Sequence, residues 1–340
     1  MADVVEEVTS EDTDGLSKPV GRAVLIGLVI GVPASVFFLW LAFRDADPSA
    51  VWDAAREADL RFVVPAVALV GLVYAFQAAR WRRIAAVENL GELRFVEMVV
   101  GAVACNNLLP GRLGELFRAR WLAVAAPMPS GRALATVGLD KGCDVLVLFA
   151  FLVVALPFVA SAAWVTRIVA GAAVLIVVLV ALFAAARLYA SARHRERRER
   201  GRIRRIVRDV VDTLAEPLGR RRFAGALGLG VLAWGAFVVV VWLIARSIGL
   251  ELEPMESVFV TAVISLGVAI PSSPGFVGTY QWLAVAALGI LDVATDEALA
   301  FSILLHASWY VPTTLVGGFL LLFRLRLGRR PRSAEPASSL

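Results

Sequence analysis

The sequence is poor in charge and in the residues that build most catalytic and metal sites. Of its 340 residues, 19% are charged, and it has two cysteines and two histidines. Soluble domains carry about 25% charged and about 45–50% apolar residues, whereas 59% of this chain is hydrophobic. The composition therefore excludes a soluble globular domain and predicts an all-α polytopic membrane protein.

The chain also lacks the signatures of several enzyme classes. It has no G-x-S-x-G, G-x-G-x-x-G, P-loop or H-E-x-x-H motif. Cys105 and Cys143 are not at a zinc-binding spacing, and His194 and His306 are the two histidines. We therefore predict a protein that is not an enzyme, holds no metal or cofactor and does not bind nucleic acid.

Several stretches are long enough to cross a hydrocarbon layer of about 30 Å, which takes about 20 apolar residues in a helix. Six such stretches are 23–43, 61–79, 133–158, 163–187, 223–248 and 299–323. Two further apolar stretches, 95–123 and 255–291, are interrupted by Pro110-Gly111 and Pro274-Gly275. Because proline breaks a helix, each is predicted to fold as a re-entrant helical hairpin.

The basic residues indicate the topology. With both tails, the loop at 80–94, the base of the first hairpin and the basic segment 187–222 on one side, that side holds 28 of the 34 basic residues. Lys and Arg collect in cytoplasmic loops, so both termini are predicted to be cytoplasmic in a cell membrane protein. Residues 1–22 and 324–340 are predicted to be a disordered and a basic cytoplasmic tail, flanking a membrane domain over 23–323.

The basic linker within this domain, 188–222, has a helical apolar spacing over 203–214. It is predicted to be an interfacial helix on the inner leaflet or a topology anchor with no further role. The two Pro-Gly breaks share the pattern P-G-x-x-G, at 110–114 and 274–278. Because the predicted topology places the two hairpins in opposite orientations, we predict an inverted repeat, as in many transporters.

Polar residues at membrane depth are costly and are therefore functional candidates. The first hairpin and the span after it carry these: Asn106, Asn107, Arg112, Glu115, Arg118, Asp140, Lys141 and Asp144. Arg112, Glu115 and Arg118 are at helical spacing, so Glu115 could hold an arginine fork for a phosphate or could only neutralise the arginines. Asp140, Lys141 and Asp144 could pair with the hairpin arginines, relay a proton or join helices, and pairing is favoured for Lys141 with Asp144.

The second hairpin carries no charge around its bend. Its candidate residues are Ser272, Ser273, Gly275, Thr279, Tyr280 and Gln281. A half-helix begins after each Pro-Gly pair, and its first amides are unpaired donors, so two such N-termini meeting near the midplane would bind a lipid phosphate. His306 in the last span is predicted to be a packing residue rather than a proton relay.

Three motifs carry a family resemblance. N-N-L-L-P-G-R-L-G-E-L-F-R at 106–118, D-K-G-C-D at 140–144 and P-S-S-P-G-F-V-G-T-Y-Q at 271–281 resemble the flippase-like family built on the lysylphosphatidylglycerol synthase transmembrane domain. This domain is the membrane part of the multiple peptide resistance factor, and the chain has nothing that resembles that protein's aminoacyltransferase domain. Gln281 replaces a frequent glutamate of the family, and His306 stands where arginine is common.

The resemblance implies movement of lipids between leaflets. We therefore predict a flippase for an anionic phospholipid or a polyprenyl-phosphate-linked lipid, with the headgroup bound where the hairpins meet. The first alternative is an intramembrane transferase acting on a lipid-linked sugar, with Glu115 or Asp140 as base. The second alternative is a non-catalytic membrane partner of a glycosyltransferase. The sequence indicates no oligomeric state.

Overall fold

The computed structural model describes three main parts of the chain. They are residues 33–159 without 35, 45 and 110–112, then 219–268, then 274–328, together with single positions at 171, 209, 210 and 213. The described residues form helices and no strand. Outside the described residues lie the predicted N-terminal tail, residues 329–340, most of the linker, about half of the span at 23–43 and all of the span at 163–187 except residue 171. Residues 324–328, predicted to begin the C-terminal tail, belong instead to helix α13.

Four described helices are long and apolar enough to cross a membrane. They are α4 (Leu60–Ala85), α7 (Ser130–Val159), α10 (Arg220–Ser247) and α13 (Thr295–Gly328). They confirm the predicted helices at 61–79, 133–158, 223–248 and 299–323. One boundary was wrong in a way that matters. The span at 61–79 continues as a helix to Ala85, so Arg80 lies in α4 and not in a cytoplasmic loop.

A short helix, α3 (Pro48–Arg56), precedes the first of these long helices. Asp47 caps its N-terminus by accepting hydrogen bonds from the hydroxyl and the backbone amide of Ser49. These bonds hold the pKa of the Asp47 carboxyl below its ordinary value. The backbone amide of Asp47 donates in turn to Asp296 at the start of α13, 2.9 Å away. The entry to α4 is thus fastened to the beginning of the last long helix.

The two interrupted stretches each form a pair of helices, as predicted. The first pair is α5 (Glu92–Leu108) and α6 (Leu113–Ala125), and the second is α11 (Pro254–Gly267) and α12 (Thr279–Gly289), with a 3₁₀ turn η1 (Pro274–Phe276) before α12. Gly275 and Gly278 have φ of 69° and 85°. This left-handed conformation favours glycine, and it lets the chain turn sharply into α12.

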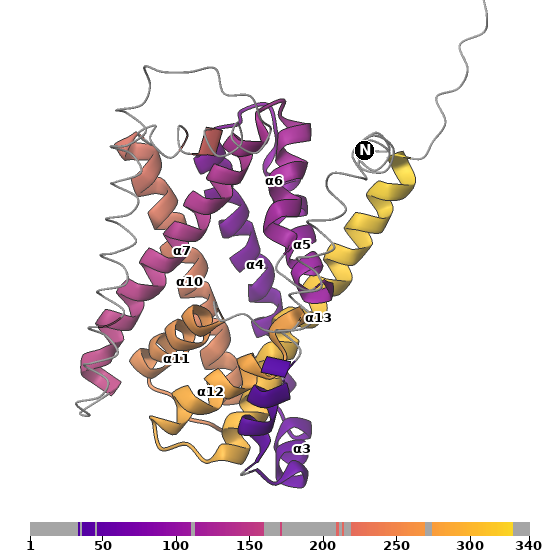
Figure 1. The fold of residues 1–340 in the computed structure, drawn as a ribbon. Coiled ribbons are helices and arrows are strands. Elements are labelled where there is room, and N and C mark those ends of the chain that lie inside the picture. The colour runs from indigo at the N-terminus through magenta and orange to yellow at the C-terminus, as the bar shows by residue number, and fades with distance from the viewer. Residues whose placement is uncertain are drawn as a thin grey trace, which may run out of the picture.

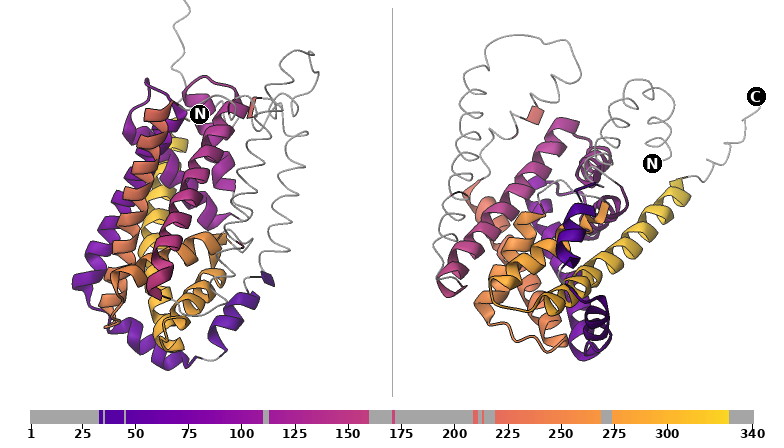
Figure 2. Two further views of the ribbon diagram at one scale, coloured as in Figure 1. Left: turned by 90° about the vertical axis from the view of Figure 1, so that its left-hand side faces the viewer. Right: turned by 60° about the horizontal axis from the view of Figure 1, so that its bottom comes forward.

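We call α4, α5, α6 and α7 the first half and α10, α11, α12 and α13 the second half, and the two sets of helices make matching contacts (Figures 1 and 2). The first arm of each pair lies against the last long helix of the other half, because α5 contacts α13 and α11 contacts α7. The second arm of each pair contacts the long helix that follows it, α6 with α7 and α12 with α13. The pairs α5/α6 and α11/α12 lie toward opposite ends of the bundle (Figure 1).

The most extensive packing between two described helices is that of α4 against α10. The amide of Asp59, at the start of α4, donates to the carbonyl of Ser247, at the end of α10. Near the other end of α4, the side chain of Arg80 lies against Gly230 in the first half of α10. The two helices therefore run antiparallel, so the corresponding helices of the two halves point in opposite directions.

Candidate functional site

The centre of the site is Arg80 on α4, whose side chain is completely buried. Its Nε donates to Asp140 Oδ1 at 2.7 Å, and its Nη1 donates to Asp144 Oδ1 at 2.6 Å. Both carboxylates lie on α7, one turn apart, so they face α4 from the same side of the helix. A buried cation needs such partners because leaving water is costly for a charge.

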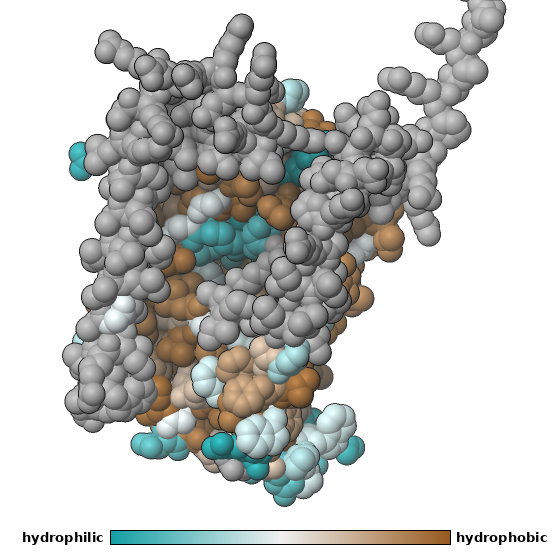
Figure 3. All heavy atoms as spheres, in the orientation of Figure 1, coloured by the Kyte–Doolittle hydropathy of each residue, from teal (hydrophilic) through white to brown (hydrophobic). Residues whose placement is uncertain are grey.

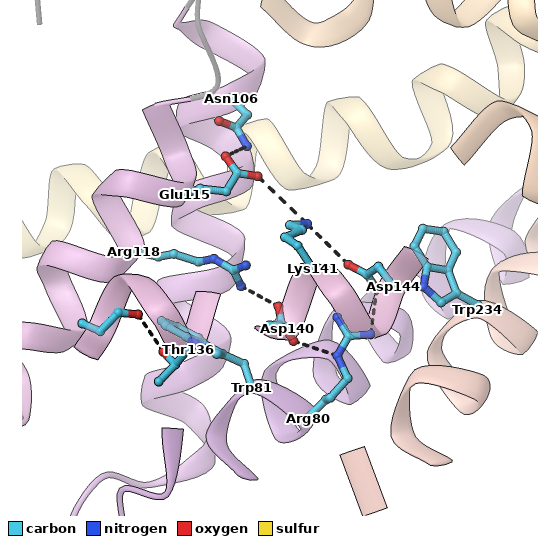
Figure 4. A network of polar contacts seen from close by, with 11 residues as sticks. Arg80, Trp81, Asn106, Glu115, Arg118, Thr136, Asp140, Lys141, Asp144 and Trp234 are labelled. Carbon is cyan, nitrogen blue, oxygen red and sulfur yellow. Dashed lines mark hydrogen bonds and ion pairs between the residues drawn. The ribbon is translucent and has the colours of Figure 1, made fainter. Parts of the chain in front are cut away.

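From this centre the ion pairs extend to hairpin α5/α6 (Figure 4). Arg118 Nη1 on α6 donates to Asp140 Oδ2 at 3.0 Å. On the other side, Lys141 Nζ lies 3.5 Å from Asp144 Oδ2 and 4.0 Å from Glu115 Oε1. Positive and negative side chains therefore alternate along a continuous series of ion pairs, the ion-pair chain. It begins at Arg118 and ends at Glu115, both on α6. It binds α4, α6 and α7 together.

At Glu115 the ion-pair chain meets an uncharged side chain, Asn106, which joins α5 to α6. Asn106 on α5 donates its Nδ2 to Glu115 Oε2 at 3.0 Å. Its Oδ1 accepts the backbone amide of Gly114 at 2.7 Å. An added Cβ at Gly114 would overlap the carbonyl oxygen of Ala102, so glycine is what allows α5 and α6 to approach so closely. Asn106 before the break and Gly114 and Glu115 after it therefore join the two helices.

The structure brings together most of the charged residues singled out from the sequence. Lys141 lies 3.5 Å from Asp144, the partner that the sequence favoured for it, and Arg118 pairs with Asp140 of the third predicted span. The proposed arginine fork on Glu115 is not formed by Arg118, because Arg118 turns toward Asp140 instead. Arg112, Pro110 and Gly111 lie outside the described residues.

A second polar group lies at the bend of the second hairpin. The amide of Gly278 donates to Gln281 Oε1 at 2.8 Å, which leaves the Gln281 Nε2 to face His306 Nδ1 at 3.0 Å. The His306 ring stacks on Tyr280 and Trp309, with centroids 4.6 and 5.0 Å away. His306 is therefore a packed and hydrogen-bonded residue, as the sequence favoured.

Three further candidate residues of the second bend make no side-chain hydrogen bond that the structure describes. The hydroxyl of Thr279 is buried and has no hydrogen-bond partner. Ser272 and Ser273 lie outside the described residues. The predicted anion site at the two half-helix N-termini also loses donors, because the amides of Gly114 and Gly278 are taken by side chains.

A cavity of about 660 Å³ lies between the two polar groups. Helices of both halves line it, including the first turns of α6 and α12 and parts of α4, α7, α10 and α13. Its polar lining is Gln77, Asn106, Asn107, Glu115, Lys141, Asp144 and Ser265, and its aromatic lining is Tyr74, Trp234, Phe237, Phe276, Tyr280 and Trp309. The lining therefore combines polar and charged groups with aromatic rings.

Two of the charged groups are accessible and four are not. The side chains of Lys141 and Glu115 are 49% and 29% exposed, whereas those of Asp144, Arg118, Asp140 and Arg80 are 9% exposed or less. In Figure 3, a patch of hydrophilic side chains lies among hydrophobic ones near the middle of the visible face, and further hydrophilic side chains lie at its lower end. A ligand in the cavity would therefore meet the ammonium of Lys141 and the carboxylate of Glu115, with the other charges behind them.

Two residues of the site were missed from the sequence, Arg80 and Trp234. Arg80 lies next to Arg82 and Arg83, so it was counted with a basic loop, although apolar residues continue at helical spacing through Ile84. Trp234 Nε1 on α10 donates to Asp144 Oδ1 at 2.8 Å. No sequence signal marks this contact, because a tryptophan inside an apolar span is an ordinary packing residue.

Asn107 ties the site to the last long helix. Its Nδ2 lies 3.2 Å from the hydroxyl of Thr313 and 2.8 Å from that of Thr314. Among the described residues, no group of three or more His, Cys, Asp or Glu side chains could hold a metal ion.

Known proteins resemble the chain over nearly its whole length. The model of the lysylphosphatidylglycerol synthase TM region matches residues 24–317. A UPF0104 membrane protein of Pyrococcus horikoshii is 25% identical over 88% of this chain and 97% of its own length. The glycosyltransferase AglD of Haloferax volcanii is 24% identical over 86% of this chain, which spans about half (53%) of AglD. No solved structure matches.

The family match covers all four long helices up to Gly317 and both interrupted stretches. It includes every residue of the ion-pair chain and of the cavity lining. The chain is therefore a multi-pass membrane protein, and it belongs to the lysylphosphatidylglycerol synthase transmembrane region family.

Proposed function

We propose that the protein is a flippase that moves an anionic phospholipid or a polyprenyl-phosphate-linked lipid between leaflets. The carrying observation is the cavity between the two halves, with the half-exposed ammonium of Lys141 in its wall. Its volume lies in the range of small-ligand sites, about 300–1,000 Å³. Ionisable residues inside a bundle of membrane helices mark substrate pathways, because their burial is otherwise too costly.

The architecture supports the same proposal. We propose six spans and two re-entrant hairpins in an inverted repeat, with both termini cytoplasmic. The antiparallel course of α4 and α10 and the matching contacts of α5 with α13 and α11 with α7 support the inversion. In inverted-repeat transporters the substrate binds near the midplane between the repeats, where this cavity lies relative to the two halves.

Within the cavity, Lys141 is the group best placed to bind a phosphate. Arg118 is 4% exposed and already bonded to Asp140, so it is a poorer phosphate ligand than the sequence implied. Lys141 has three donors and only two long contacts, at 3.5 and 4.0 Å. Asn106, Asn107 and Tyr280 line the pocket and would shape it around the headgroup, while the acyl chains would stay in lipid.

The test is transbilayer movement in proteoliposomes of fluorescent phosphatidylglycerol and of a polyprenyl phosphate. Lys141→Met should remove most of the movement, and Lys141→Arg should restore a large part of it because it returns the cation. Leu146→Met on the exposed surface of α7 serves as the control and should move lipid at the native rate. Equal rates for native protein and Lys141→Met would refute the assignment of the site.

A second candidate function comes from the similarity to AglD. Because the chain matches about half of a protein named as a glycosyltransferase, it could be the membrane partner of a separate enzyme of that class. That role predicts copurification with a glycosyltransferase and no lipid movement by the chain alone. Mass spectrometry of the lipids in the same vesicles tests the transferase alternative, which alone predicts a new lipid mass.

A further inference from the structure

The charged groups of the site balance one another. Three cations, Arg80, Arg118 and Lys141, alternate with the three carboxylates of Asp140, Asp144 and Glu115. An anionic headgroup that binds Lys141 therefore adds one negative charge to a neutral group of residues. Inside a bundle of membrane helices such an excess charge is costly, so a compensating positive charge should enter with the lipid.

The three carboxylates differ in how firmly they are held as anions. Asp140 accepts from both Arg118 and Arg80, and Asp144 accepts from Arg80 and Trp234. Glu115 has no guanidinium partner among the described residues. Its ion-pair partner among the described residues is Lys141, with Nζ 4.0 Å from Oε1, and the Glu115 side chain is the most exposed of the three. Glu115 is therefore the carboxylate that can lose its cation and reach water.

The hydrogen bonds around Glu115 are compatible with both of its protonation states. Oε2 accepts from Asn106 Nδ2, and that amide is held in this orientation because its Oδ1 accepts from Gly114. Oε1, which faces Lys141, is the free position for a proton. A protonated Oε1 would donate a hydrogen bond to a headgroup phosphate, whereas an ionised one would repel it.

We propose that each lipid phosphate enters the cavity together with one proton, which binds Glu115. This inference rests on the proposed function. The phosphate draws Lys141 away from Glu115, Glu115 takes a proton from water on the loading side, and both leave on the other side. For a lipid with one negative charge, the cycle carries no net charge across the membrane, and a pH difference drives it.

The other ionisable groups around the cavity do not compete for this role. From α7, Asp140 and Asp144 are held by arginines, and Lys141 is the cation that the phosphate engages. Arg80 of α4 donates to both Asp140 and Asp144. Tyr74 of α4 and Tyr280 of α12 also line the cavity. His306 of α13 is occupied at Nδ1 by Gln281 and is not part of the cavity lining.

The first experiment imposes a pH difference on proteoliposomes and measures the leaflet distribution of fluorescent phosphatidylglycerol. With one proton per lipid, one pH unit should shift the ratio between leaflets about tenfold. Glu115→Gln keeps the acceptor for Asn106 but cannot exchange a proton. With this variant, the leaflet distribution of phosphatidylglycerol should not depend on the pH difference. Glu92→Gln removes an exposed carboxylate that pairs with Arg82, and this matched control should behave as the native chain.

The second experiment replaces the pH difference with a membrane potential. The native chain should not respond, because lipid and proton together are neutral. Glu115→Gln should carry the bare negative charge, for which 100 mV shifts the leaflet ratio up to about fiftyfold. Native protein that moves phosphatidylglycerol but follows the potential and ignores pH would overturn the inference alone. Absence of movement of phosphatidylglycerol and of polyprenyl phosphate in the native chain would overturn the proposed function and the inference with it.

Discussion

Replacing Arg80 by methionine tests whether the ion-pair chain holds the bundle together. Arg80→Met keeps an unbranched side chain of similar packing and removes two charge-assisted hydrogen bonds, of 2.7 and 2.6 Å. Breaking a buried ion pair by removing one partner costs about 3–5 kcal/mol, mostly because the other charge stays buried. Asp140 keeps Arg118, and Asp144 keeps Lys141 and Trp234, so we expect a loss near 3 kcal/mol, the lower end of that range.

The assay is unfolding in mixed micelles with increasing SDS, followed by tryptophan fluorescence, which gives the free energy of unfolding. Arg82→Met is the matched control, because Arg82 lies two residues along the same helix and pairs with Glu92 at the surface, 3.4 Å away. Exposed pairs contribute about 0–1 kcal/mol. A cost for Arg80→Met no larger than that for Arg82→Met would refute the structural role of the network.

A double-mutant cycle separates lost contacts from lost charge balance. Arg80→Met leaves the group of six charges with one excess negative charge, and Asp144→Asn in the same chain removes that excess. The double variant should therefore be more stable than the sum of the two single changes predicts, by about 1–2 kcal/mol, within the range seen for contacting residues. Additive costs would mean that charge balance has no part in the stability of the site.

Three further predictions concern the scaffold of the site. Gly114→Ala should prevent the close approach of α5 and α6 and strongly reduce the yield of folded protein. Gly138→Ala on α7, where an added Cβ meets open space, should stabilise the fold by about 0.5–1 kcal/mol. Thermal melting of the purified variants measures both effects. Lys141→Cys should react with a charged thiol reagent added to a chain without its native cysteines, while Asp140→Cys, in a position 2% exposed, should react much more slowly. Trp234→Phe should leave headgroup binding to the first half intact but slow lipid movement several-fold, because it removes the hydrogen bond between α10 and Asp144; unchanged movement would speak against a link between the halves there.

Local sequence patterns were enough to predict the helices and the breaks between them. Apolar length predicted four of the described long helices, and Pro110-Gly111 and Pro274-Gly275 marked the interruptions that separate α5 from α6 and α11 from α12. The spacing of Asp140 and Asp144 predicted one charged face on α7. These features depend on residues within a few turns of one another, so they can be read along the chain.

Contacts between distant segments were beyond such patterns. Arg80 lies 60 residues before Asp140, and only the packing of α4 on α7 shows that a basic residue at the end of an apolar run belongs to the core. The same holds for Trp234, which lies 90 residues after Asp144. The rule that places basic residues in cytoplasmic loops was misleading at Arg80, because buried carboxylates can hold an arginine inside the bundle.

The two halves share a scaffold but not their chemistry, and this difference bears on how the protein could work. With Pro110 placed on Pro274, the positions of Glu115, Asp140 and Asp144 fall on Thr279, Leu304 and Ser308 of the second half, none of them charged. The ion pairs bind α4, α6 and α7 into one unit, whereas α12 and α13 meet through stacked rings and one amide bridge.

Stacked rings keep much of their contact energy when they slide, while a buried ion pair that separates leaves unpaired charges. We therefore expect α12 to shift against α13 more easily than α6 can shift against α7. Because Trp234 bonds to the carboxylate that also contacts Lys141, it is the point on α10 at which a change in Lys141 would reach the other half.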